Sequence, residues 1–395
     1  MGGNCPRIVC MDIVGSRQMK IISSAAYLSL FKSDPISQND FMKKAKVRVG
    51  KNLRPLSEYI EEKKINHADI KTLYENIKNR DEYLARFYHL SLRVQPEKVH
   101  MSSPMKNKEF NNNTESTYKN LIRNIHLKDI LKNTKSGMEN VPTYLDMLFD
   151  LYKNLIIDYK ILTPSAIHYM NEGRLGSVFS SYYFRASIMN PYLVYSLNKS
   201  ILHGTKIFTP TLGWSSYCYG FLECPEVLEY VGTDVIPSVC EKTKELAKSL
   251  SPKLDTTIYC KPSEDLFKSK AFMNKYKDHF DLVFFSPPYY RLEMYDGKDQ
   301  STVRYKTYEE WLEKYWDQTI QLCQHVLQPG GKMCYILSGY GSDNTKEKYD
   351  LLGDMNKITK KYFHLKSHQP MHNKDVYVRT KESETGEEIM IFIKK

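Results

Sequence analysis

The sequence predicts an α/β protein with a mainly parallel sheet in its carboxy-terminal part, preceded by a mostly helical amino-terminal part. From about residue 175 onward, short apolar runs alternate with amphipathic helical stretches, which is the pattern of βαβ units. The last two apolar runs flank the turn-like sequence SETG at 383–386, which indicates a closing antiparallel hairpin. We therefore expect two domains, residues 1–165 and residues 166–395.

Composition sets the class of protein. The 395 residues are 41% hydrophobic and 26% charged, with a formal charge of +11, which is enough apolar material for a full core. No run of about 18 apolar residues exists, and the amino terminus lacks a secretory pattern, so we expect an intracellular protein, cytoplasmic or nuclear, without a membrane partner. The eight cysteines never form CxxC, so we expect reduced thiols and no metal site.

The positive charge is concentrated in the amino-terminal part. Residues 1–165 hold 27 lysines and arginines against 18 acidic residues, whereas residues 166–395 hold 30 against 28. A basic half is typical of a surface that binds a polyanion, because each cation placed on a phosphate releases a counterion. A lysine-rich solvated surface explains the same numbers equally well, so charge alone does not decide.

In the amino-terminal domain, helical spacing of apolar residues predicts amphipathic helices within residues 37–95, then helices over 121–131 and 142–162. Residues 100–118 are polar and asparagine-rich, and we expect a flexible loop there. In the carboxy-terminal domain we expect a helix from Thr307 to Leu327 and strands at these positions: 206–208, 228–231, 257–259, 281–285, 332–337, 376–379 and 388–393.

Ligands of open parallel sheets bind beyond the carboxyl ends of the strands, so the first three strand ends are candidate sites. The first leads into Thr209–Ser216, where Gly213 allows the backbone to approach a ligand closely. The second ends at Asp234, which is placed to accept both hydroxyls of a ribose, and the third leads to Asp265, which is placed to accept from an adenine amino group. Taken alone, Asp234 is better explained as a helix-capping residue. At the third strand end, Ser263 is equally plausible as an N-cap with its neighbours in the first helical turn.

The fourth strand end carries the most specific signal, Ser286-Pro287-Pro288-Tyr289-Tyr290. Two prolines fix φ and remove two N–H donors, so they leave a rigid tip whose carbonyls face outward. The Ser286 hydroxyl and the Pro287 carbonyl are equipped to hold an exocyclic amine, while Tyr289 offers a stacking face for a flipped base. Two alternatives remain: a PPxY ligand for a WW domain, which needs an exposed segment, and a plain strand-ending turn.

Residues 180–395 resemble the S-adenosylmethionine-dependent amino-methyltransferases, which methylate exocyclic amines of adenine or cytosine in DNA. Ser286–Tyr289 resembles the family's catalytic (D/N/S)PP(Y/F/W) motif, here called the SPPY turn. Thr209–Ser215 resembles its cofactor loop, DPFxGxG: Pro210 and Gly213 match, whereas Thr209 replaces the acid and Ser215 the second glycine.

Two further segments are similar to the same family in the expected order. Gly232–Pro237 resembles its GxDxxP ribose-binding turn, and Val326–Lys332 resembles its LKPGG turn. The resemblance implies a Rossmann-like class I methyltransferase domain. Residues 1–165 resemble no family and are expected to be a basic, nucleic-acid-binding accessory domain.

The resemblance also implies a mechanism. S-adenosylmethionine is the implied cofactor, with its methionine portion at Thr209–Gly213, its ribose on Asp234 and its adenine near Asp265. The target implied is a base amine in DNA held by Ser286 and Pro287, with the base on Tyr289. The serine favours cytosine N4 over adenine N6.

Substrate contacts outside the SPPY turn are expected from Tyr290 and Arg291, and base recognition from residues 1–165 or 291–306. RNA is the alternative partner. The departures at Thr209 and Ser215 motivate a second hypothesis, a nucleic-acid-binding relative without turnover. The sequence leaves open a homodimer or a partner subunit.

Overall fold

The computed structural model describes residues 9–12, 18–338, 349–372 and 384–395. The chain forms two compact units. The first is built mainly from residues 20–93 and 127–186, and the second mainly from residues 94–126 and 187–395. The division expected at residue 165 therefore differs from the observed one, because residues 94–126 pack with the second unit and residues 166–186 pack with the first.

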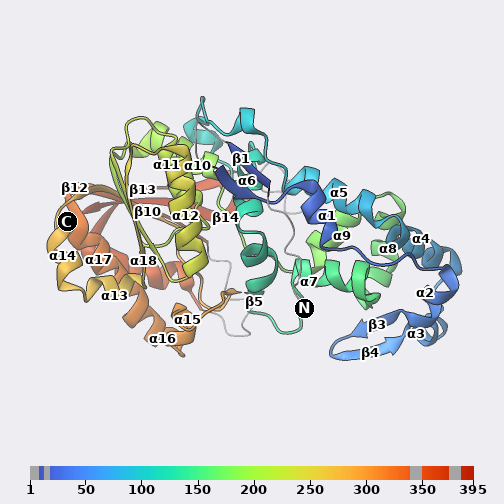
Figure 1. Cartoon of the computed structure of the whole chain (residues 1–395). Helices are drawn as coiled ribbons and strands as arrows, with labels where there is room; N and C mark the ends of the chain where they lie inside the picture. The colour runs from blue at the N-terminus through green and yellow to red at the C-terminus, as the bar shows by residue number, and fades with distance from the viewer. Residues whose placement is uncertain (1–8, 13–17, 339–348, 373–383) are drawn as a thin grey trace. The chain divides into compact units, whose positions relative to one another are not determined.

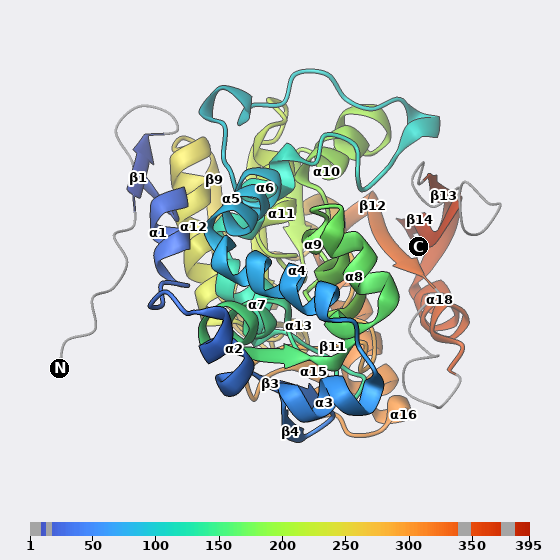
Figure 2. The same ribbon diagram turned by 90° about the vertical axis from the view of Figure 1, so that its right-hand side faces the viewer.

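The first unit is mostly helical, as expected. Within it, α4 packs against α5 and α8, and α8 packs against α9 (Figure 2). Two short strands, β1 (Val9–Asp12) and β2 (Gln18–Ile21), precede the first helix in the chain, although residues 10–12 and 18–19 are counted with the second unit. The helices are α1 (Ser24–Ser29), α2 (Gln38–Lys44), α3 (Leu56–Lys63), α4 (His67–Lys78), α5 (Arg80–Ser91), α7 (Tyr144–Phe149), α8 (Pro164–Asn171) and α9 (Leu175–Tyr182).

Two expectations for this unit are wrong in detail. A small sheet of order β4-β3-β6 interrupts the expected helices, with β3 (Lys46–Val49) and β4 (Asn52–Pro55) joined at Gly50, whose φ of +61° suits glycine. The helix expected over residues 142–162 stops after a π-helical turn, because Leu155 adopts φ +55° and β6 (Ile156–Asp158) follows. The spacing of apolar residues in a sequence does not reveal that one residue adopts a left-handed backbone conformation.

The second unit is organised around a seven-stranded sheet of order β13-β14-β12-β10-β7-β8-β9. The pairs β12–β10, β10–β7, β7–β8 and β8–β9 are parallel, whereas β14 runs antiparallel between β12 and β13. The strands are β7 (Lys206–Thr209), β8 (Glu229–Asp234), β9 (Asp255–Cys260), β10 (Phe280–Phe285), β12 (Leu327–Ser338), β13 (Phe363–His372) and β14 (Glu384–Lys394). The α/β fold class is confirmed.

Helices cover both faces of this sheet (Figure 1). On one side α10 (Pro191–Leu197) packs on α11 (Ser216–Leu222), which packs on α12 (Pro237–Leu250). On the other side α17 (Gln318–Val326) packs against both α13 and α18. The remaining elements of this part are α13 (Ser263–Phe267), α14 (Lys270–Lys275), β11 (Glu293–Met294), α15 (Ser301–Arg304), α16 (Tyr308–Trp311), the π-helical turn Leu312–Asp317 and α18 (Leu351–Tyr362).

The expected parallel strands and the helix of residues 307–327 are confirmed, with small differences in their ends. The strand expected at 376–379 lies outside the described residues. The observed antiparallel neighbours of β14 are β12 and β13. The strand β13 was not predicted, because its residues are mostly polar and exposed and include Pro370. Within the described ranges, no helix combines the length and apolar character needed to cross a bilayer.

Residues 94–126 form a loop region followed by α6 (Thr117–Ile125), fastened to the second unit. The Met101 amide donates to the Glu223 carboxylate over 3.0 Å, and the Met105 amide donates to the Ser196 hydroxyl over 3.0 Å. The side chain of Phe110 is buried. The flexible loop expected at 100–118 is thus a loop held by specific hydrogen bonds, and it adds Asn112 to the cavity described next.

Candidate active site

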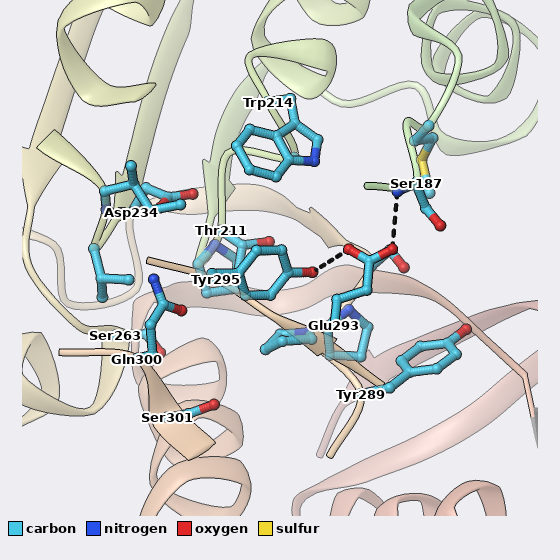
Figure 3. Close-up of a pocket in the computed structure, with 18 of the residues that line it drawn as sticks. Ser187, Thr211, Trp214, Asp234, Ser263, Tyr289, Glu293, Tyr295, Gln300 and Ser301 are labelled. Carbon is cyan, nitrogen blue, oxygen red and sulfur yellow. Dashed lines mark hydrogen bonds between the residues drawn. The ribbon is translucent and has the colours of Figure 1, made fainter. Parts of the chain in front are cut away.

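The carboxyl ends of β7, β8, β9 and β10 border one cavity of the second unit, which encloses about 1250 Å³ of empty space, part of it open to solvent (Figure 3). Of the residues predicted from the sequence, the cavity is lined by Pro210, Gly213, Asp234, Ser286, Pro287, Pro288 and Tyr289. Thr209, Asp265, Tyr290 and Arg291 are not among its lining residues. The structure thus brings seven of the predicted residues together around one cavity and leaves these four outside its lining.

The turn after β7 is left-handed over three successive residues. Gly213, Trp214 and Ser215 have φ values of +51°, +58° and +69°. The left-handed conformation costs a non-glycine residue about 1–2 kcal/mol. Trp214 and Ser215 are therefore strained, and contacts with the surrounding structure must stabilise the turn. A Cβ atom on Gly213 would lie 2.3 Å from the ring of Tyr217, so only glycine fits there.

Tyr217 of α11 connects this turn to the SPPY turn. Its hydroxyl accepts a hydrogen bond from the Ser286 amide over 3.0 Å and contacts the Ser286 carbonyl at 3.3 Å. Its ring is buried, and burial raises the pKa of its hydroxyl. The same side chain thus limits the space at Gly213 and fixes the start of the SPPY turn. The role of Tyr217 was not predicted, because an aromatic residue in an apolar helix is usually part of the hydrophobic core.

Asp234 ends β8 and faces the cavity. Its carboxylate accepts hydrogen bonds from the main-chain amides of Leu212 at 3.2 Å and Ile236 at 3.1 Å. Burial raises the pKa of Asp234 above its ordinary value, and these amide hydrogen bonds oppose that rise. The carboxylate is therefore held in place by main-chain amides at the end of the second strand.

The third strand end differs from the expectation. Asp265 is drawn away from the cavity by Arg304, whose Nη2 donates to it at 2.8 Å, whereas the neighbouring Glu264 lines the cavity. Glu264 also accepts from Arg304 Nη1 at 2.9 Å and from the Tyr305 hydroxyl at 3.2 Å. Burial raises the pKa of Glu264. Of these two adjacent acids, Glu264 lines the cavity and Asp265 does not, because α13 turns Glu264 inward.

The SPPY turn itself borders the cavity with all four residues. The Tyr289 hydroxyl accepts a hydrogen bond from the Ser338 amide at the end of β12 over 2.8 Å, which holds the ring in place. Burial raises the pKa of that hydroxyl. A rigid main chain and an anchored ring give the turn a defined shape toward the cavity.

The two departures from the family's cofactor loop point away from the cavity. Thr209 is fully buried and its hydroxyl lies 2.7 Å from that of Tyr230. Ser215 is also fully buried, and its hydroxyl lies 2.8 Å from Nε2 of His126 and 2.7 Å from the Thr243 hydroxyl. Neither side chain takes up room where a ligand would bind.

Tyr290 and Arg291 lie outside the cavity. Tyr290 is 3% exposed and its hydroxyl donates to the Lys306 carbonyl at 2.8 Å. Arg291 is exposed, and its Nη2 donates to the same carbonyl at 2.9 Å. The WW-ligand interpretation is wrong, because it requires Tyr290 to be exposed.

Glu293 of β11 is the cavity residue for which the local sequence carries the weakest signal. It is 8% exposed and lines the cavity. Its Oε1 accepts from the Ser187 amide at 2.8 Å, and its Oε2 accepts from the Tyr295 hydroxyl at 2.9 Å (Figure 3). Burial raises the pKa of Glu293, and the two donors oppose the rise. The only sequence signal is an acid soon after the SPPY turn in a stretch without periodicity.

The lining of the cavity is acidic. Among the described residues that form it, five carboxylate side chains face one cation, Lys261; the acids are Asp234, Glu264, Glu293, Asp299 and Glu387. Such a lining favours a cationic ligand and disfavours phosphates. No group of three or more His, Cys, Asp or Glu side chains in the described ranges is arranged to hold a metal ion.

Comparisons with known proteins give fold likenesses only. No family model matches the chain, and no curated protein does. The chain is similar to the N-methyltransferase NodS from Bradyrhizobium japonicum WM9, solved with S-adenosyl-l-homocysteine, at 11% identity and a TM-score of 0.33, over 51% of this chain and 83% of that chain. The chain is also similar to TrmN from Thermus thermophilus, at 12% identity and a TM-score of 0.34, over 52% of this chain and 49% of that chain. A third similar structure is the PH0226 protein from Pyrococcus horikoshii OT3, at 15% identity and a TM-score of 0.34, over 50% of this chain and 86% of that chain. At such low identity and TM-score, these likenesses carry no statement about function.

Proposed function

We propose that this protein transfers a methyl group from S-adenosylmethionine to an exocyclic amine of a base in DNA, cytosine N4 in preference to adenine N6. The observation that carries the proposal is that the SPPY turn lines the same cavity as Gly213 and Asp234. A turn suited to holding an amine and strand ends suited to a nucleoside are thus found at one site.

The residues present fit S-adenosylmethionine. Gly213 lines the cavity without a side chain of its own, and the ring of Tyr217 packs closely against its backbone. The carboxylate of Asp234 is held by amides in a position to accept from ribose hydroxyls. The acidic lining suits a ligand that carries a sulfonium and an ammonium group.

In this proposal, Pro210–Trp214 hold the methionine portion, Asp234 holds the ribose, and Pro262, Ser263 and Glu264 replace Asp265 around the adenine. When bound, S-adenosylmethionine supplies an electrophilic methyl group. The protein's contribution to the cofactor is then position and exclusion of water, because Trp214, Tyr295 and Tyr315 also line the cavity.

The SPPY turn prepares the amine. The lone pair of an aromatic exocyclic amine delocalises into the ring, so the amine is a poor nucleophile. The Ser286 hydroxyl and the Pro287 carbonyl, each accepting one amine hydrogen, draw the nitrogen toward tetrahedral geometry and aim its lone pair. Tyr289, anchored through the Ser338 amide, supports the plane of the base. Positioning of this kind is worth several kcal/mol.

The partner proposed is a nucleic acid whose phosphates stay outside the acidic cavity while a neutral base edge enters. The basic surplus of residues 1–165 suits the phosphates. DNA is favoured over RNA by the serine of the SPPY turn, which is the residue type expected for cytosine N4 transfer.

The test is transfer of a radiolabelled methyl group from S-adenosylmethionine to duplex DNA, single-stranded DNA and RNA, followed by nucleoside analysis. We expect labelled N4-methylcytosine from DNA with the wild-type protein, and much less with Asp234→Asn when S-adenosylmethionine is present at a concentration that does not saturate the variant. Label in N6-methyladenine or in RNA would correct the substrate. Salt-dependent binding of nucleic acid without any binding of S-adenosylmethionine by calorimetry would favour the nucleic-acid-binding relative without turnover and would overturn the proposal.

A further inference from the structure

We propose that Glu293 is the proton acceptor for the target amine, an inference that rests on the proposed function. Neither the family resemblance nor the SPPY turn assigns a role to this residue. The inference concerns what happens to the amine once its methyl group has arrived, and it follows from the position and the hydrogen bonds of one buried carboxylate.

The chemistry requires a base near the SPPY turn. As the new N–C bond forms, the C–S bond breaks and its electron pair goes to sulfur, so the sulfonium becomes a neutral thioether and the nitrogen becomes cationic. One proton must then leave the nitrogen to give the neutral methylated amine. The Ser286 hydroxyl and the Pro287 carbonyl hold the two amine hydrogens before transfer but are weak bases. Once the nitrogen is cationic, one of these two protons passes to the carboxylate, which later releases it to water.

Glu293 is placed for this task. Its carboxylate lines the same cavity as Ser286 and Tyr289, and it lies between Tyr295 and Ser187 (Figure 3). Each of its two oxygens accepts one hydrogen bond, from the Ser187 amide at 2.8 Å and from the Tyr295 hydroxyl at 2.9 Å. A carboxylate has about four lone-pair sites, so these donors fix its orientation and leave acceptor capacity toward the cavity.

The other acidic side chains that line the cavity either bind other partners or lie at other positions. Asp234 accepts from main-chain amides at the end of β8, and Glu264 is paired with Arg304. Asp299 is exposed. Glu387 lies opposite Ser338 in the β12–β14 ladder, and the nearby Lys119 opposes the rise that burial causes in its pKa.

The surroundings of Glu293 favour proton uptake. Its pKa is raised by burial and lowered only by the Ser187 and Tyr295 hydrogen bonds, with no cation among the causes. The titratable neighbours that interact with this part of the cavity are tyrosines and acids: Tyr217, Tyr289, Tyr295, Asp234 and Glu387. Because the acceptor must begin deprotonated, activity should fall as pH drops through this raised pKa.

The experiment compares wild type with Glu293→Gln and with a matched control, Asp296→Asn, in the full chain. Asp296 is exposed, lies in the same segment and is not among the cavity's lining residues, so the control makes the same charge change elsewhere. We expect Glu293→Gln to lower kcat roughly 100-fold and to lose the acidic limb of the pH–rate profile, while Asp296→Asn changes neither. Calorimetry should show S-adenosylhomocysteine bound equally well, within about twofold, by all three proteins.

A readout without turnover tests the same point. In the free protein labelled with ¹³C at glutamate carboxyl carbons, the signal lost in Glu293→Gln should titrate in the wild type above the ordinary range of glutamate. Tyr295→Phe provides a second variant that keeps the carboxylate. Because it removes a donor that lowers the Glu293 pKa, it should move both this titration and the acidic limb of the rate profile to higher pH.

The outcomes separate this inference from the proposed function. An active wild type whose Glu293→Gln variant keeps its kcat and its acidic limb would overturn the inference and leave the methyl transfer standing. A Glu293→Gln variant that loses affinity for S-adenosylhomocysteine but keeps kcat would make Glu293 a binding residue for the ammonium group and would likewise overturn it. A wild type without transfer would refute the proposed function itself.

Discussion

Two buried carboxylates, Asp234 and Glu293, border one cavity and are held in different ways. Asp234 accepts from main-chain amides, those of Leu212 and Ile236 among them. Glu293 accepts from one main-chain amide and from a phenol, Tyr295. Burial raises the pKa of both acids.

The difference indicates a division of labour. Main-chain donors belong to the fold and cannot be withdrawn by rotating a side chain, so Asp234 is suited to accept hydroxyl hydrogens from a bound ribose. A phenol donor can rotate and adjust its hydrogen bond, so the proton affinity of Glu293 depends on its surroundings. In the proposed function, the β8 end of the cavity serves binding, and the end formed by the SPPY turn and Glu293 serves the chemical step.

The largest effect is expected from Gly213→Ala, which should disturb both the β8 end of the cavity and the end formed by the SPPY turn and Glu293. The new Cβ would lie 2.3 Å from the ring of Tyr217, whose hydroxyl holds Ser286. We expect a loss of roughly 2–5 kcal/mol in the free energy of unfolding and no detectable binding of S-adenosylhomocysteine by calorimetry.

The matched control is Gly50→Ala, since Gly50 has a similar φ of +61° with no atom within 4 Å of the new Cβ. It should cost only about 1 kcal/mol in unfolding free energy and leave binding intact. Equal stability losses in the two variants would show that the Tyr217 ring moves aside at little cost. Tyr217 would then not couple the Gly213 turn to Ser286.

Ser286→Ala should affect only the chemical end. Loss of one acceptor for the amine is expected to cost roughly 1–3 kcal/mol of barrier, which is about ten- to a hundredfold in kcat. Affinity for S-adenosylhomocysteine, measured by calorimetry, should be unchanged. Unaltered turnover would remove Ser286 from the mechanism.

Asp234→Asn should affect chiefly the binding end. Replacing a charged acceptor by an amide, whose NH2 group would also face a main-chain donor, should weaken S-adenosylhomocysteine binding roughly 10- to 100-fold. Because burial raises the pKa of Asp234, wild-type affinity should fall as pH drops through that raised value, and the variant should lack this dependence. Matching pH profiles would mean that Asp234 does not contact the ligand.

The smallest effect on function is expected from Thr209→Val. Thr209 is outside the cavity and bonded to the Tyr230 hydroxyl, so ligand affinity should change by less than about twofold. Stability should fall by about 1–3 kcal/mol, because Tyr230 is left with a buried hydroxyl that has lost this partner. A large loss of affinity would show that the position where the family carries an acid still matters here.

The parts of the site that the sequence revealed are those in which chemistry follows a strand directly. Pro210, Asp234 and the SPPY turn each stand at the end of an apolar run, so their place at one sheet edge could be expected from the βαβ pattern. The choice between Glu264 and Asp265 could not, because it depends on how α13 turns and on Arg304, which is 39 residues away from Asp265.

Residues whose role depends on distant partners were not predictable from local pattern. The amide that orients Glu293 belongs to Ser187, 106 residues earlier in the chain. Tyr217 is defined by its bond to Ser286, 69 residues away. The helical unit was also harder to predict, since one left-handed residue, Leu155, ends an otherwise helical apolar pattern.

The most direct test of the central claim is a crystal structure of the protein with S-adenosylhomocysteine. The account predicts the ribose hydroxyls on the carboxylate of Asp234, the adenine beside Glu264 rather than Asp265, and the sulfur directed toward the SPPY turn. A cavity that stays empty at saturating ligand, or a ligand whose sulfur points away from Ser286, would contradict it.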